Sequence, residues 1–372
     1  MSNIMNVLIV GKKGEFNIGQ SSSGMPRYIS EIYSRIKVNN SVNIDKFEAK
    51  VLPLTGKLPH INDAYFYLQT TFKNFARYNI IHNPDPSNII NQGHMKGAIS
   101  IATIHDLLPI LHPELIYGSI KKQDDNYITF YYMLNRLVLK ADIKLARIGI
   151  LTALNSDYII VNSSQTKTDV IKYGIDTNKV FITNMGVDER FLSKIALQEK
   201  RHTFTIGYVG GINYKKNIEF ALKASMHIQD SNIKFSIWGE RTIYAALIAK
   251  KYRKDKKIEF KGFAPEKKLV DVYDSFDVFV FPSVHEGFGQ PILEAQARGL
   301  PVIIYKYGKI PKEVRKYCFE AESPEHMAQI IEDIKENGYN EKLRKKATEY
   351  ARSFTWEKTA KETLEVYKKV LK

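Results

Sequence analysis

The segment 285–291 combines residue types that suit a polyhydroxylated, phosphorylated ligand. It contains Glu286 and two glycines, and Glu294 follows Glu286 by eight residues. The segment comes after a strand-like apolar run and leads into a predicted helix, Ile292 to Arg298, that Pro291 opens and Gly299 ends, with Glu294 in its first turn. A helix N-terminus attracts anions, and paired hydroxyl groups are good donors to carboxylates. The spacing therefore points to a sugar or a ribose held beside a phosphate, although either glutamate alone would be read as a surface or dipole-compensating charge.

Two lysines occupy an unfavourable place after another strand-like run, 204–209. Gly211 follows this run, and Lys215 and Lys216 come directly before Asn217, the predicted N-cap of the next helix. Cations destabilise a helix N-terminus unless an anion is present. The pattern therefore predicts a bound anion, although solvated surface lysines would look the same in so basic a chain.

A long loop after the first strand-like run, 6–10, is a third candidate anion site. It contains Gly19 and Gly24 and leads into a helix with Pro26 near its start. The apolar residues of that helix recur on one face at Ile29, Ile32 and Ile36. The length of the loop excludes the dinucleotide pattern Gly-x-Gly-x-x-Gly. Both a phosphate-binding loop and a plain connection fit this spacing.

Strands and helices must position these loops, and strand-like runs alternate with helical patterns along the whole chain. This alternation predicts an α/β fold with parallel sheets covered by helices. The polar stretch 188–202 divides the pattern, so we expect two Rossmann-like, doubly wound domains at 1–195 and 202–352. The final segment, 353–372, reads as an amphipathic helix that joins the first domain. The predicted strands are 6–10, 98–104, 158–162, 180–183, 204–209, 234–238, 257–260, 277–281 and 302–304.

Composition narrows the possible partners and the compartment. The 372 residues include 55 Lys+Arg and 40 Asp+Glu, and the net charge of +15 favours nucleotides, nucleic acid or anionic lipid headgroups. The one cysteine, Cys318, excludes an internal disulfide and a cysteine-clustered metal site. No apolar run reaches the length of a membrane span and no signal peptide is recognisable, so we expect a cytoplasmic protein.

Taken together, these segments resemble glycosyltransferase family 4, whose members have the GT-B fold of two Rossmann-like domains facing across a cleft. The resemblance covers nearly the whole chain, and the stretch from Glu286 to Glu294 is its most specific part. The other matching segments are weak singly but occur in the order and spacing of the family. They are 23–24, 103–107, 160–164, 184–188, 208–210, 216–217, 261–263 and 354–356.

The resemblance implies a retaining hexosyltransferase that uses a nucleotide diphosphate sugar, such as a UDP- or GDP-sugar, without a metal or another cofactor. Glu286 would bind the donor sugar, Lys216 would neutralise the leaving diphosphate, and His105, at the end of its strand, would face the sugar. Read without the family, a lone histidine at such a place is more often a structural residue. The hexose, such as mannose or glucose, and the acceptor stay open.

The donor-binding residues implied by the resemblance come mainly from the C-terminal domain. Glu294 would hold the ribose hydroxyls, and the backbone near Gly262 and Phe263 would contact the base. Gly24 would bring backbone amides to the phosphates from the N-terminal domain. The remaining donor-binding residues are Gly211, Lys215, Lys216, Glu286, Gly287, Phe288, Gly289 and Gln290.

The sequence departs from the family at two places. Gly211 stands where many members carry an arginine, and we interpret Lys215 as the substitute cation. The segment Tyr305 to Lys309 lacks the small polar residues that often follow this strand. The second departure leaves the preference for sugar and acceptor undetermined.

A basic stripe suggests where the acceptor is recruited. The expected acceptor is a glycan, a lipid-linked molecule or another hydroxyl compound, and no specific nucleic acid is expected. Arg136, Lys140, Lys144 and Arg147 share one helical face of the N-terminal domain, which fits peripheral association with an anionic membrane and equally a merely solvated face. Two other functions remain open: a noncatalytic protein that binds anionic surfaces or nucleic acid, and a nicotinamide-dependent oxidoreductase, which the missing Gly-x-Gly-x-x-Gly disfavours.

Overall fold

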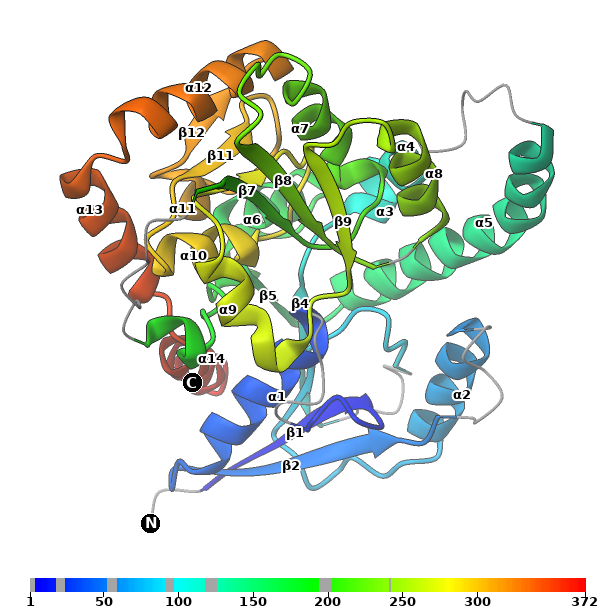
Figure 1. Cartoon of the computed structure of the whole chain (residues 1–372). Helices are drawn as coiled ribbons and strands as arrows, with labels where there is room; N and C mark the ends of the chain where they lie inside the picture. The colour runs from blue at the N-terminus through cyan, green and yellow to red at the C-terminus, as the bar shows by residue number, and fades with distance from the viewer. Residues whose placement is uncertain are drawn as a thin grey trace. The chain divides into compact units, whose positions relative to one another are not determined.

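Two compact units divide the chain in the computed structural model, which describes residues 4–17, 24–51, 59–90, 97–117, 126–193, 202–240 and 242–372. The first unit consists mainly of the residues up to Gly186 and of the terminal segment Trp356–Lys372, and the second mainly of Val187–Thr355. Each unit contains a six-stranded sheet with helices packed against it (Figure 1). All strand pairs are parallel, so the predicted α/β class is confirmed.

The sheet of the first unit has the strand order β2-β1-β3-β4-β5-β6. The order reverses between β1 and β3, as it does at the ligand-binding switch point of flavodoxin-like sheets. The strands are β1 (Met5–Lys12), β2 (Val42–Ala49), β3 (Ile80–Asn83), β4 (Ile99–Ile104), β5 (Tyr158–Val161) and β6 (Val180–Ile182). The helices are α1 (Gly24–Lys37), α2 (Pro59–Thr71), α3 (Leu108–Leu111), α5 (Asn126–Leu154), α6 (Ser164–Lys172) and α14 (Trp356–Val370), and the short α4 (Pro113–Tyr117) has residues in both units.

The sheet of the second unit has the order β12-β11-β10-β7-β8-β9, the strand order of a Rossmann fold. Its switch point lies between β7 and β10. The strands are β7 (Phe204–Val209), β8 (Ile233–Trp238), β9 (Ile258–Gly262), β10 (Val278–Phe281), β11 (Val302–Tyr305) and β12 (Phe319–Ala321). The helices are α7 (Ile218–Ala224), α8 (Ile243–Tyr252), α9 (Leu269–Asp274), α10 (Gln290–Ala297), α11 (Lys312–Arg315), α12 (Pro324–Asn337) and α13 (Glu341–Arg352).

Burial on both faces explains why the central strands are continuous apolar runs. All four residues of β10 are fully buried, and the rings of Phe279 and Phe281 stack with centroids 6.2 Å apart. A parallel sheet covered on both faces requires such runs. In the first unit, Ile29 and Ile32 of α1 are likewise fully buried, as their helical spacing predicts.

Three strands were missed by the sequence prediction. β2 lies at the edge of its sheet and carries Asp45, Lys46 and Glu48, so it lacks the apolar run of a central strand. β3 has four residues and β12 three, and periodicity is weak over such lengths. These misses concern strand existence and leave the predicted class unchanged.

The terminal helix α14 packs within the first unit. It lies against α1, and its Trp356, Thr363 and Tyr367 are buried. The Thr359 hydroxyl also donates a hydrogen bond of 2.6 Å to the carbonyl of Asn184. Within the described residues, no helix has both the length and the apolar composition needed to cross a membrane.

Candidate functional site

The switch point of the second unit brings two predicted anion-binding loops to one edge of the sheet. β7 and β10 are hydrogen-bonded neighbours, so the loops that follow them begin side by side. Helices that leave adjacent strands in opposite directions open a crevice there, which is where α/β sheets bind ligands. The first loop carries Gly211, Lys215 and Lys216, and the second carries Glu286.

Lys216 and Glu286 form a buried ion pair at this switch point. The Lys216 Nζ atom lies 2.6 Å from Glu286 Oε1, and the two side chains are only 15% and 8% exposed. Burial alone would raise the pKa of Glu286, but the charges of Lys216 and Lys215 hold the pKa below its usual value. Lys216 also lies over the ring of Phe281, with 4.9 Å between Nζ and the ring centroid. The structure thus joins two predicted site residues that are 70 positions apart in the chain.

The backbone around Glu286 is held from two sides. Val284 N donates to the Lys215 carbonyl at 2.9 Å, and Glu286 N donates to the Lys309 carbonyl at 3.0 Å. Lys309 N donates in turn to the Val284 carbonyl at 2.9 Å. A Cβ atom at Gly308 would lie 2.3 Å from the Ser283 carbonyl oxygen, so only glycine permits this approach. The loop after β11, which departs from the family pattern, therefore fixes the position of Glu286, a role that the sequence reading did not assign.

Glu294 lies in the second turn of α10, not in the first turn as predicted. The helix begins at Gln290, two residues before its predicted start, because Gly289 adopts φ +94° at the N-cap and Pro291 fits the first turn. Glu294 is 6% exposed, and it accepts a hydrogen bond of 2.7 Å from the hydroxyl of Tyr273. Tyr273, a buried residue of α9, was missed because nothing in its sequence context marks it as a partner of Glu294.

The turn between the two glutamates is compact. Phe288 is 3% exposed and its ring lies 6.2 Å from that of Phe354, so it is a packing residue of this unit. Gly287 is half-buried, and Gly289 takes the left-handed conformation that favours glycine. The backbone from Gly287 to Gln290 therefore leads directly into the N-terminus of α10, the end of a helix that attracts anions.

The loop after β7 differs from its predicted form near Asn217. Asn217 occupies the N-cap position of α7 but makes no side-chain cap, and its Nδ2 donates to the Pro282 carbonyl at 3.2 Å. The side chain of Asn213 caps a short 3-10 turn over Tyr214–Lys216 instead. Asn217 thus ties the lysine loop to the end of β10, and its φ of 49° is of the kind that asparagine tolerates.

Gly211 is held by a residue that the sequence reading had treated only as part of a strand. The buried hydroxyl of Tyr208 donates to the Gly211 carbonyl at 2.8 Å. A Cβ atom at Gly239, after β8, would lie 2.3 Å from the Gly210 carbonyl oxygen. The loop where many family members carry an arginine is therefore tightly packed against Tyr208 of β7 and Gly239 after β8.

Gly262 and Phe263 lie at the end of β9, the edge strand, with β8 between β9 and β7. Gly239 N donates to the Gly262 carbonyl at 2.8 Å, and the Phe263 ring is 53% exposed. These two residues and the Lys216–Glu286 pair all lie at the carboxyl ends of the strands of this sheet. Among the described residues, no hydrogen bond joins Gly262 or Phe263 to that pair. An exposed aromatic ring at this edge is available for stacking on a base.

The predicted residues of the first unit lie at the corresponding edge of its own sheet. His105 directly follows β4, and its Nε2 lies 3.0 Å from the Pro84 carbonyl. Burial lowers the pKa of His105, opposed by that hydrogen bond and by the charges of Asp85 and Asp106. Gly24 is the exposed first residue of α1, whereas Gly19 and Ser23 lie outside the described residues.

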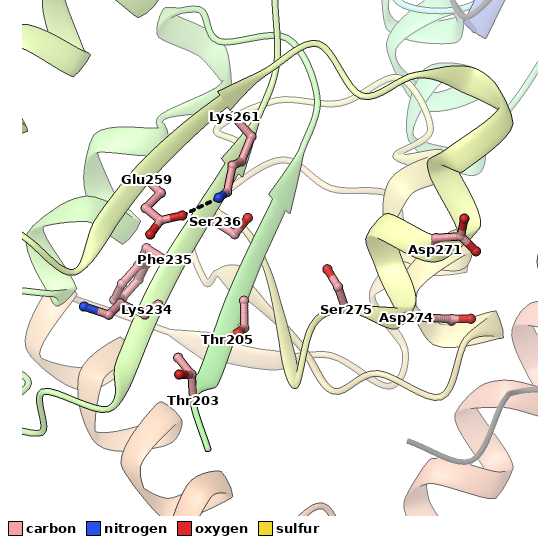
Figure 2. A pocket seen from close by; sticks show the side chains of 10 residues that line it. All are labelled: Thr203, Thr205, Lys234, Phe235, Ser236, Glu259, Lys261, Asp271, Asp274 and Ser275. Atoms are coloured by element: carbon pink, nitrogen blue, oxygen red, sulfur yellow. Dashed lines mark ion pairs between the residues drawn. The ribbon is translucent and has the colours of Figure 1, made fainter. Parts of the chain in front are cut away.

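A surface cavity of about 670 Å³ lies in the second unit, apart from the Glu286 group. Figure 2 shows α9 residues Asp271 and Asp274 on one side of it and strand side chains on the other. The strand side chains include Thr205, Ser236 and Lys261. The cavity shares no lining residue with the predicted donor site. In the part of the chain that the structure describes, no group of three metal-binding side chains is found.

Two family models match the chain in sequence order. The model "Glycosyltransferase Family 4" matches residues 25–191, and "Glycosyl transferases group 1" matches residues 189–354. An uncharacterized glycosyltransferase of Methanocaldococcus jannaschii is 30% identical over 220 residues. That alignment covers 56% of this chain and 56% of the relative, so the match spans little more than half the length of the curated relative.

Solved structures share the fold over nearly the whole chain. Sucrose-phosphate synthase from Thermosynechococcus elongatus has a TM-score of 0.72 at 17% identity, with 99% of both chains covered. The Anabaena protein HepE in complex with UDP and glucose has a TM-score of 0.66 at 14% identity, covering 98% of this chain and 99% of that one. The two family models, which together span residues 25–354, identify the chain as a group 1 glycosyltransferase similar to family 4, and the solved structures show that its fold is GT-B.

Proposed function

We propose that the protein transfers a hexose from a nucleotide diphosphate sugar to a hydroxyl acceptor with retention of configuration and without a metal. The observation that carries this proposal is the buried Lys216–Glu286 pair at the switch point of the second unit. The pair joins a cation and a carboxylate at the switch point, and sheets of this kind bind nucleotides at such points. Glu294, held by Tyr273, is the proposed ribose ligand.

The proposed chemistry is electrostatic. As the bond between the sugar and the diphosphate breaks, negative charge grows on the phosphate oxygens and positive charge on the sugar ring. Lys216 and Lys215, with the amides at the start of α10, stabilise the leaving diphosphate because they are fixed before the reaction. Glu286 accepts hydrogen bonds from sugar hydroxyls, and the pairing with Lys216 keeps its carboxylate ionised. The acceptor attacks from the side of the leaving group, and the diphosphate takes up its proton.

The donor is best sought among nucleotide sugars with different bases. The Anabaena neighbour was solved with UDP and with UDP-glucose, which supports UDP-sugars as the first candidates. The test is to incubate the protein with UDP-, GDP- and ADP-sugars, with and without EDTA, and to measure release of the nucleotide diphosphate. Release from one donor class that survives EDTA supports the proposal. If none of the donors yields nucleotide diphosphate and none binds by calorimetry, the proposed function is wrong.

The exposed face of α5 is the proposed contact with an anionic membrane. Lys140, Lys144 and Arg147 are exposed, and Ile148 and Leu151 continue the same face at 40% and 38% exposure. The side chain of Arg136 lies outside the described residues. Cations beside exposed apolar side chains fit a lipid headgroup region better than a nucleic acid or a soluble glycan. We therefore propose a lipid-linked acceptor and peripheral binding at the cytoplasmic membrane face.

Vesicle binding tests this surface separately from the chemistry. Each lysine or arginine near an anionic bilayer contributes about 1 kcal/mol, so replacing all three cations with glutamine should weaken binding by roughly a hundredfold. Ile148→Ser with Leu151→Ser should also weaken it, because apolar area is lost from the interface. The matched charge control is Lys342→Gln, Lys345→Gln and Lys346→Gln on α13, whose side chains are likewise exposed. Donor hydrolysis should stay unchanged in all of these variants. If the stripe variants and the control variant bind anionic vesicles equally well, the proposed membrane-binding surface is wrong.

A further inference from the structure

A line of four fully buried polar side chains leads to His105 in the first unit. Its members are Tyr28 of α1, His82 of β3, Thr103 of β4 and Tyr367 of the terminal helix α14, and each has 0% of its surface exposed. Burying four polar side chains between a sheet and two helices is costly unless each is hydrogen-bonded. Their presence where apolar residues would pack more simply calls for a role.

The hydrogen bonds join the four residues in one line. The Tyr367 hydroxyl lies 2.6 Å from His82 Nδ1, and His82 Nε2 lies 2.8 Å from the hydroxyl of Thr103. The Thr103 hydroxyl lies 3.2 Å from that of Tyr28. The line therefore runs from the C-terminal helix through the sheet to the first helix of the chain.

His82 is neutral, so it donates through one ring nitrogen and accepts through the other. Burial, and then the neighbouring His105, lower the pKa of His82 to about 3. If Tyr367 donates to Nδ1, then Nε2–H donates to Thr103 and Thr103 donates to Tyr28. The other tautomer reverses every bond. In both arrangements the line is continuous, and such chains strengthen their members cooperatively.

The line ends against the ring of His105. The rings of Tyr28 and His105 meet edge to face, with centroids 5.1 Å apart and an angle of 86° between their planes. The centroid of the Tyr28 ring also lies 6.2 Å from that of Trp356, the first residue of α14. His105 Nε2, which lies 3.0 Å from the Pro84 carbonyl, donates to that oxygen in the neutral ring and leaves Nδ1 as the acceptor nitrogen. Two contacts thus set the orientation of the His105 ring.

We propose that Tyr367, His82, Thr103 and Tyr28 are positioning residues through which the terminal helix fixes the ring of His105. The proposal rests on the proposed function only for the part that His105 plays in sugar transfer. The packing of α14 against the first unit then affects more than stability. Removing the Tyr367 hydroxyl should change the orientation of the His105 ring although no residue of the second unit is altered.

The test compares variants that break the line with variants that only remove a hydroxyl elsewhere. Tyr367→Phe removes the first hydrogen bond and keeps the ring, and Thr103→Val breaks the line in the middle at nearly constant volume. Thr103→Ser keeps the hydroxyl and should restore the parent behaviour. The control is Tyr78→Phe, which removes a partly buried hydroxyl bonded to Asp45; Tyr78 lies just before β3, at the amino ends of the strands, whereas His105 lies at their carboxyl ends.

The first readout is the NMR signal of the His105 ring in the full-length protein. The chain has nine histidines, and loss of one signal in His105→Gln gives the assignment. We expect Tyr367→Phe and Thr103→Val to shift this signal, and Thr103→Ser and Tyr78→Phe to leave it in place. The second readout is donor hydrolysis, where the line-breaking variants should lower kcat about fivefold to tenfold and leave KM for the donor unchanged, because one buried hydrogen bond is lost.

The outcomes separate positioning from stability and from the proposed function. An unshifted His105 signal in folded Tyr367→Phe or Thr103→Val overturns the proposal, even if those variants melt at a lower temperature. A shifted signal with a loss of kcat that Thr103→Ser does not show supports it. If the parent releases no nucleotide from any donor, the proposed function fails, and the NMR comparison alone still decides whether the line positions His105.

Discussion

Replacing Lys216 with methionine should destabilise the protein, because it leaves the buried carboxylate of Glu286 without its partner. Methionine keeps a flexible apolar chain over Phe281 and removes the ammonium group that lies 2.6 Å from Glu286 Oε1. The carboxylate, 8% exposed, then lacks its main partner, which typically costs about 3 to 5 kcal/mol. Protonating a glutamate at pH 7 costs about 4 kcal/mol, and this sets the upper limit. Because Lys215 also lowers the pKa of Glu286, we expect about 3 kcal/mol.

Calorimetric melting of the Lys216→Met, Glu286→Gln and double variants measures this pair. For a unit of this size about 3 kcal/mol corresponds to a fall in Tm of roughly 6 to 12 °C. The double variant has no lone buried charge, so it should recover much of the loss, while donor hydrolysis stays impaired in all three. The control is Lys306→Met, which breaks an exposed pair with Glu322 and should change Tm little. Equal melting of Lys216→Met and Lys306→Met, or a double variant as unstable as the sum of the singles, would refute the reasoning.

Three further predictions concern other groups at the two sheet edges. Glu294→Ala should weaken binding of a nucleotide diphosphate about tenfold to a hundredfold in calorimetry, with Tyr273→Phe weaker in effect because it keeps the carboxylate; unchanged affinity would remove Glu294 from the ribose site. Burial, and then Asp85, raise the pKa of Glu15 to about 7, so Glu15 stabilises the fold less as pH rises from about 4.5 to 7. Chemical unfolding should show Glu15→Gln gaining on the parent by up to about 3 kcal/mol over that range, and parallel curves would contradict this. Gly308→Ala should lower both Tm and turnover, because its Cβ atom would lie 2.3 Å from the Ser283 carbonyl oxygen, and a variant with parent-like Tm and rate would show that this approach is not needed.

The sequence was sufficient for the fold class and for the placement of most loops that carry the predicted site residues. Burial of β10 on both faces demands a continuous apolar run, and the helix after it needs Pro291 at its start and Gly299 at its end. These are local requirements, and they are visible in the order of the residues. Edge strand β2 escaped because one side of it is free to carry charges, so its pattern is not that of a buried strand.

Partnership between distant residues was decided only by the tertiary structure. Lys216 and Glu286 meet because β7 and β10 are neighbours in the sheet, and the sequences of the two loops do not predict this strand order. The sequence around Tyr273, Gly308 and Tyr367 marks them only as ordinary helix or turn residues. Their contacts, with Glu294, Ser283 and His82 respectively, form because the fold brings distant segments together. Hydrogen bonds between side chains act over about 3 Å, whereas sequence patterns report only which face of an element is buried. The sequence by itself therefore determined which residues could do the chemistry, and the fold determined which of them hold one another in place.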